Sequence, residues 1–250
     1  MHPKIYITNI FKINMKRFYL FFLIFFVGIG SIFGRSRIPQ SVSTKVTDTI
    51  IVVDGTKYRL ALSGAVNMGT GRPYWAACNV GARSPEEYGA YFAWGEYNSK
   101  REYTWDNYKY AYTTPTDIRI TKYGRGIDGR WTLTEDDDAA TQNWGGLWRM
   151  PNYGDLDRLF RTTIWDYFTL RGTEGVVICS TKTKKAIFVP LAGAMTMDGL
   201  VGKDADAYIW ISDMFYSGVI YGQALVFTDC MTKKTYERYF GFSVRPVYGK

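Results

Sequence analysis

Histidine is almost missing from this chain. Its 250 residues contain one, His2, at the extreme N-terminus. From residue 35 onward there is none, which excludes a Ser-His-Asp triad, a Cys-His nucleophile pair and histidine-ligated zinc in that region. Only carboxylates, Lys, Tyr, Ser or Cys remain as chemical groups. We therefore predict no catalytic residue and no cofactor.

Cysteine is also scarce. Cys78, Cys179 and Cys230 lie far apart, so none of the short spacings typical of zinc sites is present. One disulfide with a leftover thiol and three buried free thiols both remain open as interpretations.

A basic stripe is lacking as well, although the formal charge is +8, from 31 Lys and Arg against 23 Asp and Glu. Four of these bases precede residue 35, where there are no acids, so 27 bases face 23 acids afterwards and the charge falls to +4. Apart from short clusters at 182–185 and 233–234, the bases are scattered, as on a solvated surface. We expect no nucleic-acid partner.

The N-terminal segment has the pattern of a leader. A basic Lys16-Arg17 pair precedes the apolar run FYLFFLIFFVGIG, and small residues follow it. Residues 1–34 are therefore predicted as a signal peptide, starting at Met1 or Met15. The alternative is an uncleaved anchor over 18–34, at the short limit of a membrane span. Residues 35–47 are polar and patternless, which predicts a linker.

Two short helices are predicted within residues 131–160. Thr134 is a candidate N-cap for the first, with acidic residues on its first turn, and Gly145-Gly146 would end it. Residues 147–150 are expected to form a buried extended link. Asn152 would cap the second helix, whose Leu156, Leu159 and Phe160 would face inward.

The remaining elements before this stretch are predicted from turn residues and β-branched runs. A hairpin turning at Asp54-Gly55 is expected over 49–62, a strand over 75–80, a single helical turn over 84–87 and an extended piece over 91–94. Residues 97–130 are rich in Tyr, Thr, Asn, Asp and Gly without apolar periodicity, which predicts a long ordered loop.

Short strands follow the helices in sequence. They are predicted over 176–180, 186–191, 207–212, 224–228 and 242–247. Helices followed by an antiparallel sheet indicate an α+β fold, and the length from residue 48 to residue 250 suits a single domain.

Several segments carry a family resemblance. YWAACNVGARSPEEYGAYFAWGE, ITKYG, EDDDAATQNWGGLWRMP, YIWIS and GFSVRPV occur in the order found in the Fibrobacter succinogenes major paralogous domain family. The chain resembles that family over about residues 50–248. The resemblance implies an exported protein of Bacteroides-type bacteria, and it carries over no catalytic residue.

That family is similar to the C-type-lectin-like fold, including the formylglycine-generating and sulfatase-modifying branch. The resemblance implies two helices in a curved antiparallel sheet, with the link between the helices given by Trp144, Gly146, Arg149 and Pro151. The chain departs from the family pattern at Asn152, where threonine is usual, and over 208–212, where Tyr-Trp-Ser-Ser is usual. We expect structural roles for Trp144, Gly146, Trp148, Arg149, Pro151 and Arg245.

The two arginines in apolar surroundings, Arg149 and Arg245, have two interpretations each. A buried guanidinium needs a partner, most simply a carboxylate, and this structural role is the one we favour. The alternative is an anion-binding arginine.

The acidic run at 135–138 also has two interpretations. Clustered carboxylates suit calcium, which makes Asp136, Asp137 and Asp138 candidate ligands. The alternating spacing of a calcium loop is missing, however, so we favour helix capping for these residues.

Aromatic and polar residues suggest where a ligand could bind. Trp105 and Trp131 lie in polar surroundings, and a predicted loop between two late strands mixes rings with a carboxylate. Such mixtures are typical of binding surfaces. The predicted ligand-binding residues are Trp105, Trp131, Asp213, Phe215, Tyr216 and Tyr221.

These patterns predict a non-catalytic ligand-binding module of the bacterial envelope or surface, whose partner is an extracellular glycan or protein. One alternative is a carboxylate-based glycan-active enzyme, for which Glu86, Glu87, Glu96 and Glu102 form the only cluster worth testing. Another is a purely structural envelope protein. Contact with a membrane is expected only through an uncleaved leader.

Overall fold

A hairpin begins the described part of the chain. The computed structural model describes residues 48–216 and 218–249, so the leader at 1–34 and the linker at 35–47 lie outside it. Strand β1 (Asp48–Val53) pairs antiparallel with β2 (Thr56–Ala61). Asp54 and Gly55 both have positive φ, as a tight two-residue hairpin turn requires. The predicted hairpin is confirmed.

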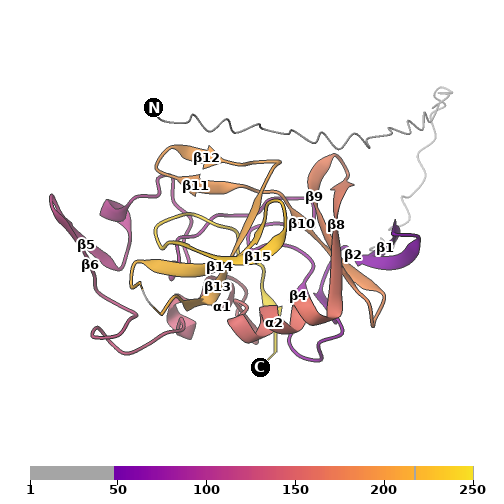
Figure 1. Ribbon diagram of the computed structural model, residues 1–250, viewed down its shortest axis with the longest axis horizontal. Helices are drawn as coiled ribbons and strands as arrows, with labels where there is room; N and C mark the ends of the chain where they lie inside the picture. Colours follow the sequence, from indigo (N-terminus) through magenta and orange to yellow (C-terminus); the bar gives the residue numbers. More distant parts are fainter. Residues whose placement is uncertain (1–47, 217, 250) are drawn as a thin grey trace, which may run out of the picture. The chain divides into compact units, whose positions relative to one another are not determined.

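This hairpin forms one side of a five-stranded sheet (Figure 1). The strands in spatial order are β1, β2, β10 (Lys185–Pro190), β9 (Thr173–Ser180) and β8 (Thr163–Leu170). Only the β2–β10 pair is parallel; the other neighbours are antiparallel. The predicted strands at 176–180 and 186–191 are confirmed as β9 and β10. Strand β8 was not predicted, because it follows a helix directly, without a Gly, Pro or Asn to mark the boundary.

A second sheet has three antiparallel strands, β13 (Ala207–Met214), β14 (Tyr221–Phe227) and β15 (Met231–Glu237). The pairing of β13 with β14 is irregular between Trp210 and Met214. The strands predicted at 207–212 and 224–228 are confirmed, whereas β15 was missed because polar residues at 232–235, Lys233 and Lys234 among them, interrupt any apolar alternation.

Smaller pairings join distant parts of the chain. A four-stranded sheet has the order β3 (Ala65–Val66), β4 (Tyr74–Ala76), β16 (Val247–Tyr248) and β7 (Trp148–Arg149). Strand β11 (Ala194–Thr196) pairs with β12 (Gly199–Val201). The strands expected at 75–80 and 242–247 are therefore much shorter than predicted. Residues 242 and 243 make only isolated bridges, because they pass between Phe92 and Ile209 in the interior and do not follow a single partner strand.

The second helix begins and ends close to its predicted limits. Helix α2 (Tyr153–Thr162) is capped by Asn152, whose Oδ1 accepts a hydrogen bond from the Asp155 backbone N–H at 2.9 Å. In turn, Asp155 Oδ2 accepts a hydrogen bond from the Asn152 N–H at 2.9 Å, which completes a reciprocal cap. Leu156 and Leu159 are fully buried, and Phe160 packs partly against the same cluster. The amphipathic pattern is thus confirmed.

The first helix begins later than predicted. Residues 135–137 form a short 3-10 turn, η2 (Glu135–Asp137), and helix α1 (Ala139–Trp144) follows it. The cap is Asp138, whose Oδ1 accepts from the Thr141 N–H at 2.9 Å, whereas Thr134 makes no side-chain cap. The prediction of Thr134 as N-cap was wrong. The Asp138 carboxylate also accepts the Met150 N–H from the link between the helices, and this second bond holds Asp138 in the cap position. Gly145 and Gly146, both with positive φ, end α1 as predicted.

The link after α1 is extended, but less buried than expected. Leu147 is exposed, Trp148 and Arg149 are half-buried, and only Met150 is buried. The reason is that Leu147, Trp148 and Arg149 line an open cleft, described below.

The stretch at 97–130 is not a structureless loop. It contains the 3-10 turn η1 (Trp105–Asn107) and a hairpin of β5 (Ala111–Thr114) and β6 (Asp117–Ile120). Ile118 and Ile120 alternate with polar residues on β6, and Ala111 and Ile120 pack against the aromatic core, but strands of four residues give too short an apolar pattern to predict the hairpin. The single turn predicted at 84–87 is present: the Glu87 N–H donates to the Ser84 carbonyl at 3.3 Å, and Glu87 Oε2 accepts the Arg83 N–H at 2.9 Å.

The interior consists of three groups of buried side chains. One is rich in aromatic residues: Trp210 stacks on Phe242 with ring centroids 4.2 Å apart, and Trp94 lies edge-on to Tyr123 at 5.3 Å. The other two lie against the five-stranded sheet and include Leu156 and Leu159 of α2. Few helices and extensive antiparallel pairing make this an α+β protein, as predicted. None of the described helices is long and apolar enough to cross a membrane.

Two buried arginines in the core pair with uncharged oxygens. Arg245 donates from Nε to Asn79 Oδ1 at 2.8 Å and from Nη2 to the Phe188 carbonyl at 2.9 Å. Arg238 donates from Nη2 to the Tyr123 carbonyl at 3.0 Å and lies 4.6 Å from the centre of the Trp94 ring. Burial lowers the pKa of both guanidinium groups. The expectation of a carboxylate partner for Arg245 was wrong: carbonyl and amide oxygens surround it.

Candidate functional site

Two segments distant in sequence form the framework of the candidate site. The Leu133 N–H donates to the Ser212 carbonyl at 2.9 Å, and the Met214 N–H donates to the Trp131 carbonyl at 2.9 Å. Between these bonds, Thr132 and Asp213 face each other as a bridge. The end of β13 therefore holds residues 131–133 as a short additional strand.

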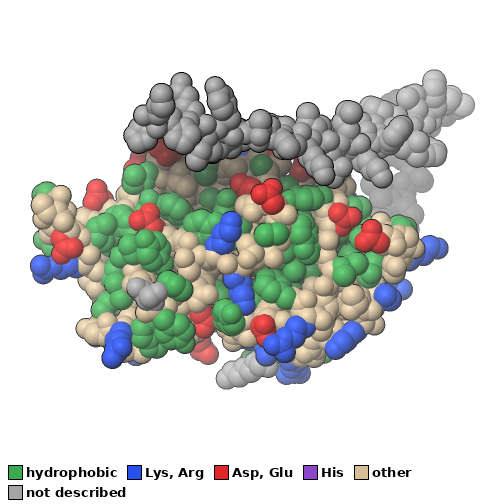
Figure 2. All heavy atoms as spheres, in the orientation of Figure 1, with side chains coloured by type: hydrophobic (Ala, Val, Ile, Leu, Met, Phe, Trp, Pro, Cys, Tyr) green, Lys and Arg blue, Asp and Glu red, His purple; other side chains and the backbone are tan. Residues whose placement is uncertain are grey.

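A pair of aromatic rings lies at one end of this ladder. The rings of Trp131 and Tyr216 have centroids 4.9 Å apart and are tilted by 39°. Tyr216 is 75% exposed and Trp131 is partly exposed. Figure 2 shows hydrophobic side chains gathered around the loop that joins β13 to β14, which carries Tyr216 and the exposed Phe215. We call Trp131 and Tyr216 the ring pair.

Asp213 connects the ring pair to α2. Its Oδ1 accepts the Thr132 hydroxyl at 3.1 Å, and its Oδ2 accepts the Tyr153 N–H, at the start of α2, at 2.7 Å. Burial raises the pKa of Asp213, and these two hydrogen bonds oppose that effect. Asp213 thus holds three segments in register, which identifies a positioning role for this predicted binding residue.

A cleft opens beside the ring pair. It has a volume of about 380 Å³ and lies between η2, α1, β7 and the end of β13. Its polar lining includes Thr132, Glu135, Arg149, Asn152 and Ser212. Since Thr132 and Ser212 belong to both the ladder and the lining, the cleft lies beside the strand segment that carries Trp131. The volume falls within the range of small-ligand sites.

Arg149 is the cation in the lining of this cleft. Its Nη1 donates to Asp155 Oδ2 at 2.6 Å and to the Met150 carbonyl at 3.0 Å. Asp155 also accepts from Arg158 Nη2 at 2.5 Å, so one buried carboxylate holds two guanidinium groups. The side chain of Arg149 remains 25% exposed, so it combines a structural ion pair with a surface that faces the cleft.

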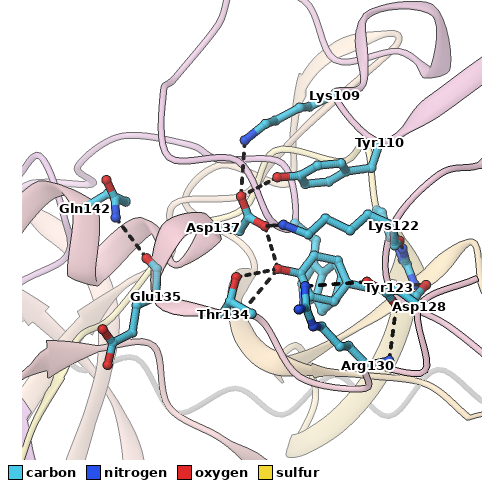
Figure 3. A network of polar contacts seen from close by, with 12 residues as sticks. Lys109, Tyr110, Lys122, Tyr123, Asp128, Arg130, Thr134, Glu135, Asp137 and Gln142 are labelled. Atoms are coloured by element: carbon cyan, nitrogen blue, oxygen red, sulfur yellow. Dashed lines mark hydrogen bonds and ion pairs between the residues drawn. The ribbon is translucent and has the colours of Figure 1, made fainter.

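The acidic run divides into three different roles. Asp136 is exposed and Asp138 caps α1, but Asp137 is buried beneath two lysines and two tyrosines (Figure 3). Among residues 48–216 and 218–249, no group of three or more His, Cys, Asp or Glu side chains could hold a metal ion. Helix capping, the interpretation favoured from the sequence, describes Asp138 but is wrong for Asp137.

Asp137 is the centre of a charged network. It accepts hydrogen bonds from the hydroxyls of Tyr110 and Tyr123 and pairs with Lys109, at 3.2 Å, and with Lys122. Burial alone would raise the pKa of Asp137, but these donors outweigh it and lower the pKa to about 2. Because four donors already occupy the two oxygens of this carboxylate, little hydrogen-bonding capacity remains for a ligand. We therefore assign Asp137 a structural role.

The other predicted binding residues lie at different distances from the ring pair. Phe215 is exposed beside Tyr216, and its N–H donates to the Tyr221 carbonyl at 3.3 Å. Tyr221 is half-buried at the start of β14. Trp105 lies apart from them, in a separate groove under the β5–β6 hairpin.

Three of the residues predicted as structural, Gly146, Trp148 and Arg149, line the cleft. Trp144 and Trp148 pack edge-on with centroids 4.9 Å apart, and the Pro151 carbonyl accepts the Ser212 N–H at 2.8 Å. Gly146 lines the cleft with a φ of 63°, a conformation that a side chain would strain. The link between the helices therefore forms one wall of the cleft.

The glutamates considered for an enzyme do not meet in one place. Glu86 pairs with Arg171 at 2.8 Å, and Glu96 pairs with Lys100 at 3.0 Å. Glu87 accepts a backbone N–H in its own turn, and Glu102 is exposed. The four carboxylates therefore have separate partners or lie exposed, and none of them lines the cleft beside the ring pair.

Sequence reasoning did not single out several lining residues as binding candidates. Thr132, Glu135, Asn152 and Ser212 line the cleft, yet each has an ordinary local context. The signal that could have found Thr132 was its position beside Trp131. Ser212 had no such signal, because its place in the site depends on the ladder.

Comparisons of the chain with protein-family models, curated proteins and solved structures gave no match.

Proposed function

We propose that this protein is a non-catalytic module that binds a glycan at the ring pair and the adjoining cleft. The observation that carries the proposal is the exposed Tyr216 ring, held against Trp131, whose neighbour in sequence, Thr132, lines a polar cleft. An exposed aromatic pair leaves apolar ring surface in contact with water, which a bound ligand would cover. Ring faces also suit the apolar faces of sugars.

The cleft complements the rings with hydrogen-bonding groups. Thr132, Asn152 and Ser212 offer hydroxyl and amide groups, while Glu135 and Arg149 bring both signs of charge. A ligand with many hydroxyls can both donate to and accept from such a lining. Apolar surface combined with a few placed polar groups is typical of ligand sites.

The proposed setting is the bacterial envelope or surface, which the leader pattern at 1–34 supports. We further propose a C-type-lectin-like fold and a place near the Fibrobacter succinogenes major paralogous domain family. The supporting features are the two helices joined by the extended link from Trp144 to Pro151 and the antiparallel sheets.

A glycan array probed with the full chain tests the proposal. We expect selective binding that Tyr216→Ala weakens about tenfold, the effect of losing about 1.4 kcal/mol of contact. Because Tyr216 is so exposed, this variant should fold normally. Tyr112→Ala is the matched control: it removes a tyrosine that is 64% exposed on β5, away from the ring pair. A blank glycan array, or equal binding by Tyr216→Ala, would overturn the proposal; binding to proteins alone would replace the glycan by a protein ligand.

A carboxylate-based glycan-active enzyme remains the second candidate, because Glu135 and Asp138 both line the cleft. Burial raises the pKa of Asp138, as in a general acid, but both its oxygens accept backbone N–H groups from Thr141 and Met150. Those bonds favour the ionised form and oppose an acid role. Incubation with a glycan panel decides: turnover that Glu135→Gln abolishes would establish the enzyme.

A further inference from the structure

A second concave surface lies under the β5–β6 hairpin. This groove, with a volume of about 550 Å³, is lined by η1, by the hairpin turn at residues 113–118 and by Ile220. It contains Trp105, which the sequence predicts as a binding residue but the structure places outside the first cleft. We call it the Trp105 groove.

The tryptophan in this groove is held in a fixed orientation. Tyr108 packs edge-on to Trp105 with centroids 5.6 Å apart, and Tyr239 does so at 5.0 Å. The ring nevertheless remains partly exposed at the groove surface. A rigid ring loses little conformational entropy when a ligand stacks on it.

Polar groups around the ring are acidic or hydroxylic. Asp106 Oδ1 accepts the Thr113 hydroxyl at 2.7 Å, which fixes the carboxylate at the groove, and Thr114 and Asp117 add further oxygens. Among the described residues that line the groove there is no Lys or Arg. Arg119, which is outside the lining, pairs with Asp117 at 3.2 Å. The lining itself presents carboxylates, which disfavour an anionic ligand and accept hydrogen bonds from hydroxyl groups. The lining therefore suits an uncharged sugar.

The groove and the ring pair lie on the same connection between two strands. Tyr216 and Ile220 are four residues apart in the loop from β13 to β14, so their Cα atoms are at most about 14 Å apart. Tyr216 contacts Trp131, and Ile220 lines the Trp105 groove. The short Cα separation is within the span of an extended ligand of a few sugar units.

We propose that the Trp105 groove is a second subsite, which takes uncharged sugar units of the same glycan that occupies the ring pair. This inference rests on the proposed function. Joining two contacts through one ligand makes the second contact intramolecular, so affinity should rise steeply with chain length once a glycan spans both subsites.

The test is calorimetric titration of the full chain with a series of increasing lengths of an uncharged glycan that binds on the array. Trp105→Leu should weaken the longest chains about tenfold and leave the shortest unchanged. Trp105 also packs on Tyr108 and Tyr239, so a second variant, Ile118→Ala, removes apolar contact surface from the exposed groove wall without touching the aromatic core. Tyr112→Ser is the matched control, since it changes an exposed β5 side chain that does not line the groove.

The outcomes separate the two proposals. A loss confined to long chains in both groove variants, with Tyr112→Ser unchanged, supports the second subsite. If Trp105→Leu and Ile118→Ala bind every length normally while Tyr216→Ala loses binding, the subsite is overturned and the proposed function stands. If the unaltered protein binds no glycan of any length, both fail.

Discussion

The Tyr123 hydroxyl donates a hydrogen bond to Asp137 Oδ2 at 2.5 Å and also lies 3.0 Å from Thr134 Oγ1. This contact joins the turn before α1 to the polypeptide that follows the β5–β6 hairpin (Figure 3). Tyr123 is fully buried and lies edge-on to Trp94. The polar network around Asp137 is therefore continuous with the aromatic core.

Replacing Asp137 should destabilise the protein and change its response to acid. Asp137→Asn leaves Lys109 and Lys122 without their carboxylate, for an expected loss of about 3 kcal/mol in the free energy of unfolding. The folded-state pKa of Asp137 lies at about 2, below its ordinary 3.8, so its stabilisation is present above about pH 4 and is lost as pH falls towards 2. Urea unfolding measured across this range is the test.

Asp136→Asn is the control for that experiment, because Asp136 is an exposed neighbour. It should change neither the stability near neutral pH nor the acid-dependent slope beyond a few tenths of a kcal/mol. An unchanged slope in Asp137→Asn would contradict the assignment.

The N-cap of α1 can be located by mutation. Asp138→Ala should cost about 1–2 kcal/mol, since it removes the cap on Thr141 and leaves the buried Met150 N–H without its acceptor. Exposed Glu135 provides the comparison, and Glu135→Ala should cost no more than a few tenths. Thermal or chemical unfolding of the two variants distinguishes Asp138 from its neighbour, and equal effects would contradict this cap.

Two glycines should respond to alanine in opposite directions. Gly154 lies in α2, and an added Cβ there meets only ordinary contacts, so Gly154→Ala should stabilise the helix by about 0.5–1 kcal/mol. At Gly175 in β9 an added Cβ would overlap the ring of Phe188, so Gly175→Ala should cost roughly 1–3 kcal/mol. Melting temperatures measured side by side test both signs; a stable Gly175→Ala would show that Phe188 can move.

Thiol labelling tests the cysteine environments. All three cysteines are free; Cys230 is exposed, Cys78 half-buried and Cys179 buried. Burial raises the pKa of Cys179 to about 12 and also raises that of Cys78. At pH 8 a disulfide reagent should therefore react quickly at Cys230 alone, because the thiolate is the reactive form. Cys230→Ser should abolish the fast phase; fast labelling that persists would contradict the burial of the other two.

Local signals predicted much of the secondary structure. The Asp54-Gly55 turn, the Asn152 cap and the spacing of Leu156 and Leu159 each depend on neighbours in the chain, and each is confirmed. The hairpin at 111–120 was missed because each strand has only four residues and only Ala111 and Ile120 pack against the core, which leaves too short an apolar pattern.

The candidate site was only partly visible in the sequence. Trp131 and Tyr216 were both predicted to bind ligand, but nothing in their local context indicated that they touch. Their contact depends on the ladder between residues 131–133 and the end of β13, which joins positions about eighty residues apart. Trp105 was grouped with them by residue type, yet it lies in another groove.

The sequence by itself determined the α+β class, the shortage of imidazole chemistry and the helix with its cap, because each follows from composition or from spacing within one turn. Only the tertiary structure decided the roles of the acids at 136–138. Asp136 is exposed, Asp137 is paired with two lysines and Asp138 caps α1. Consecutive carboxylates are chemically alike. What separates them is which distant donors the folded backbone brings within hydrogen-bonding distance, and local spacing contains no information about that.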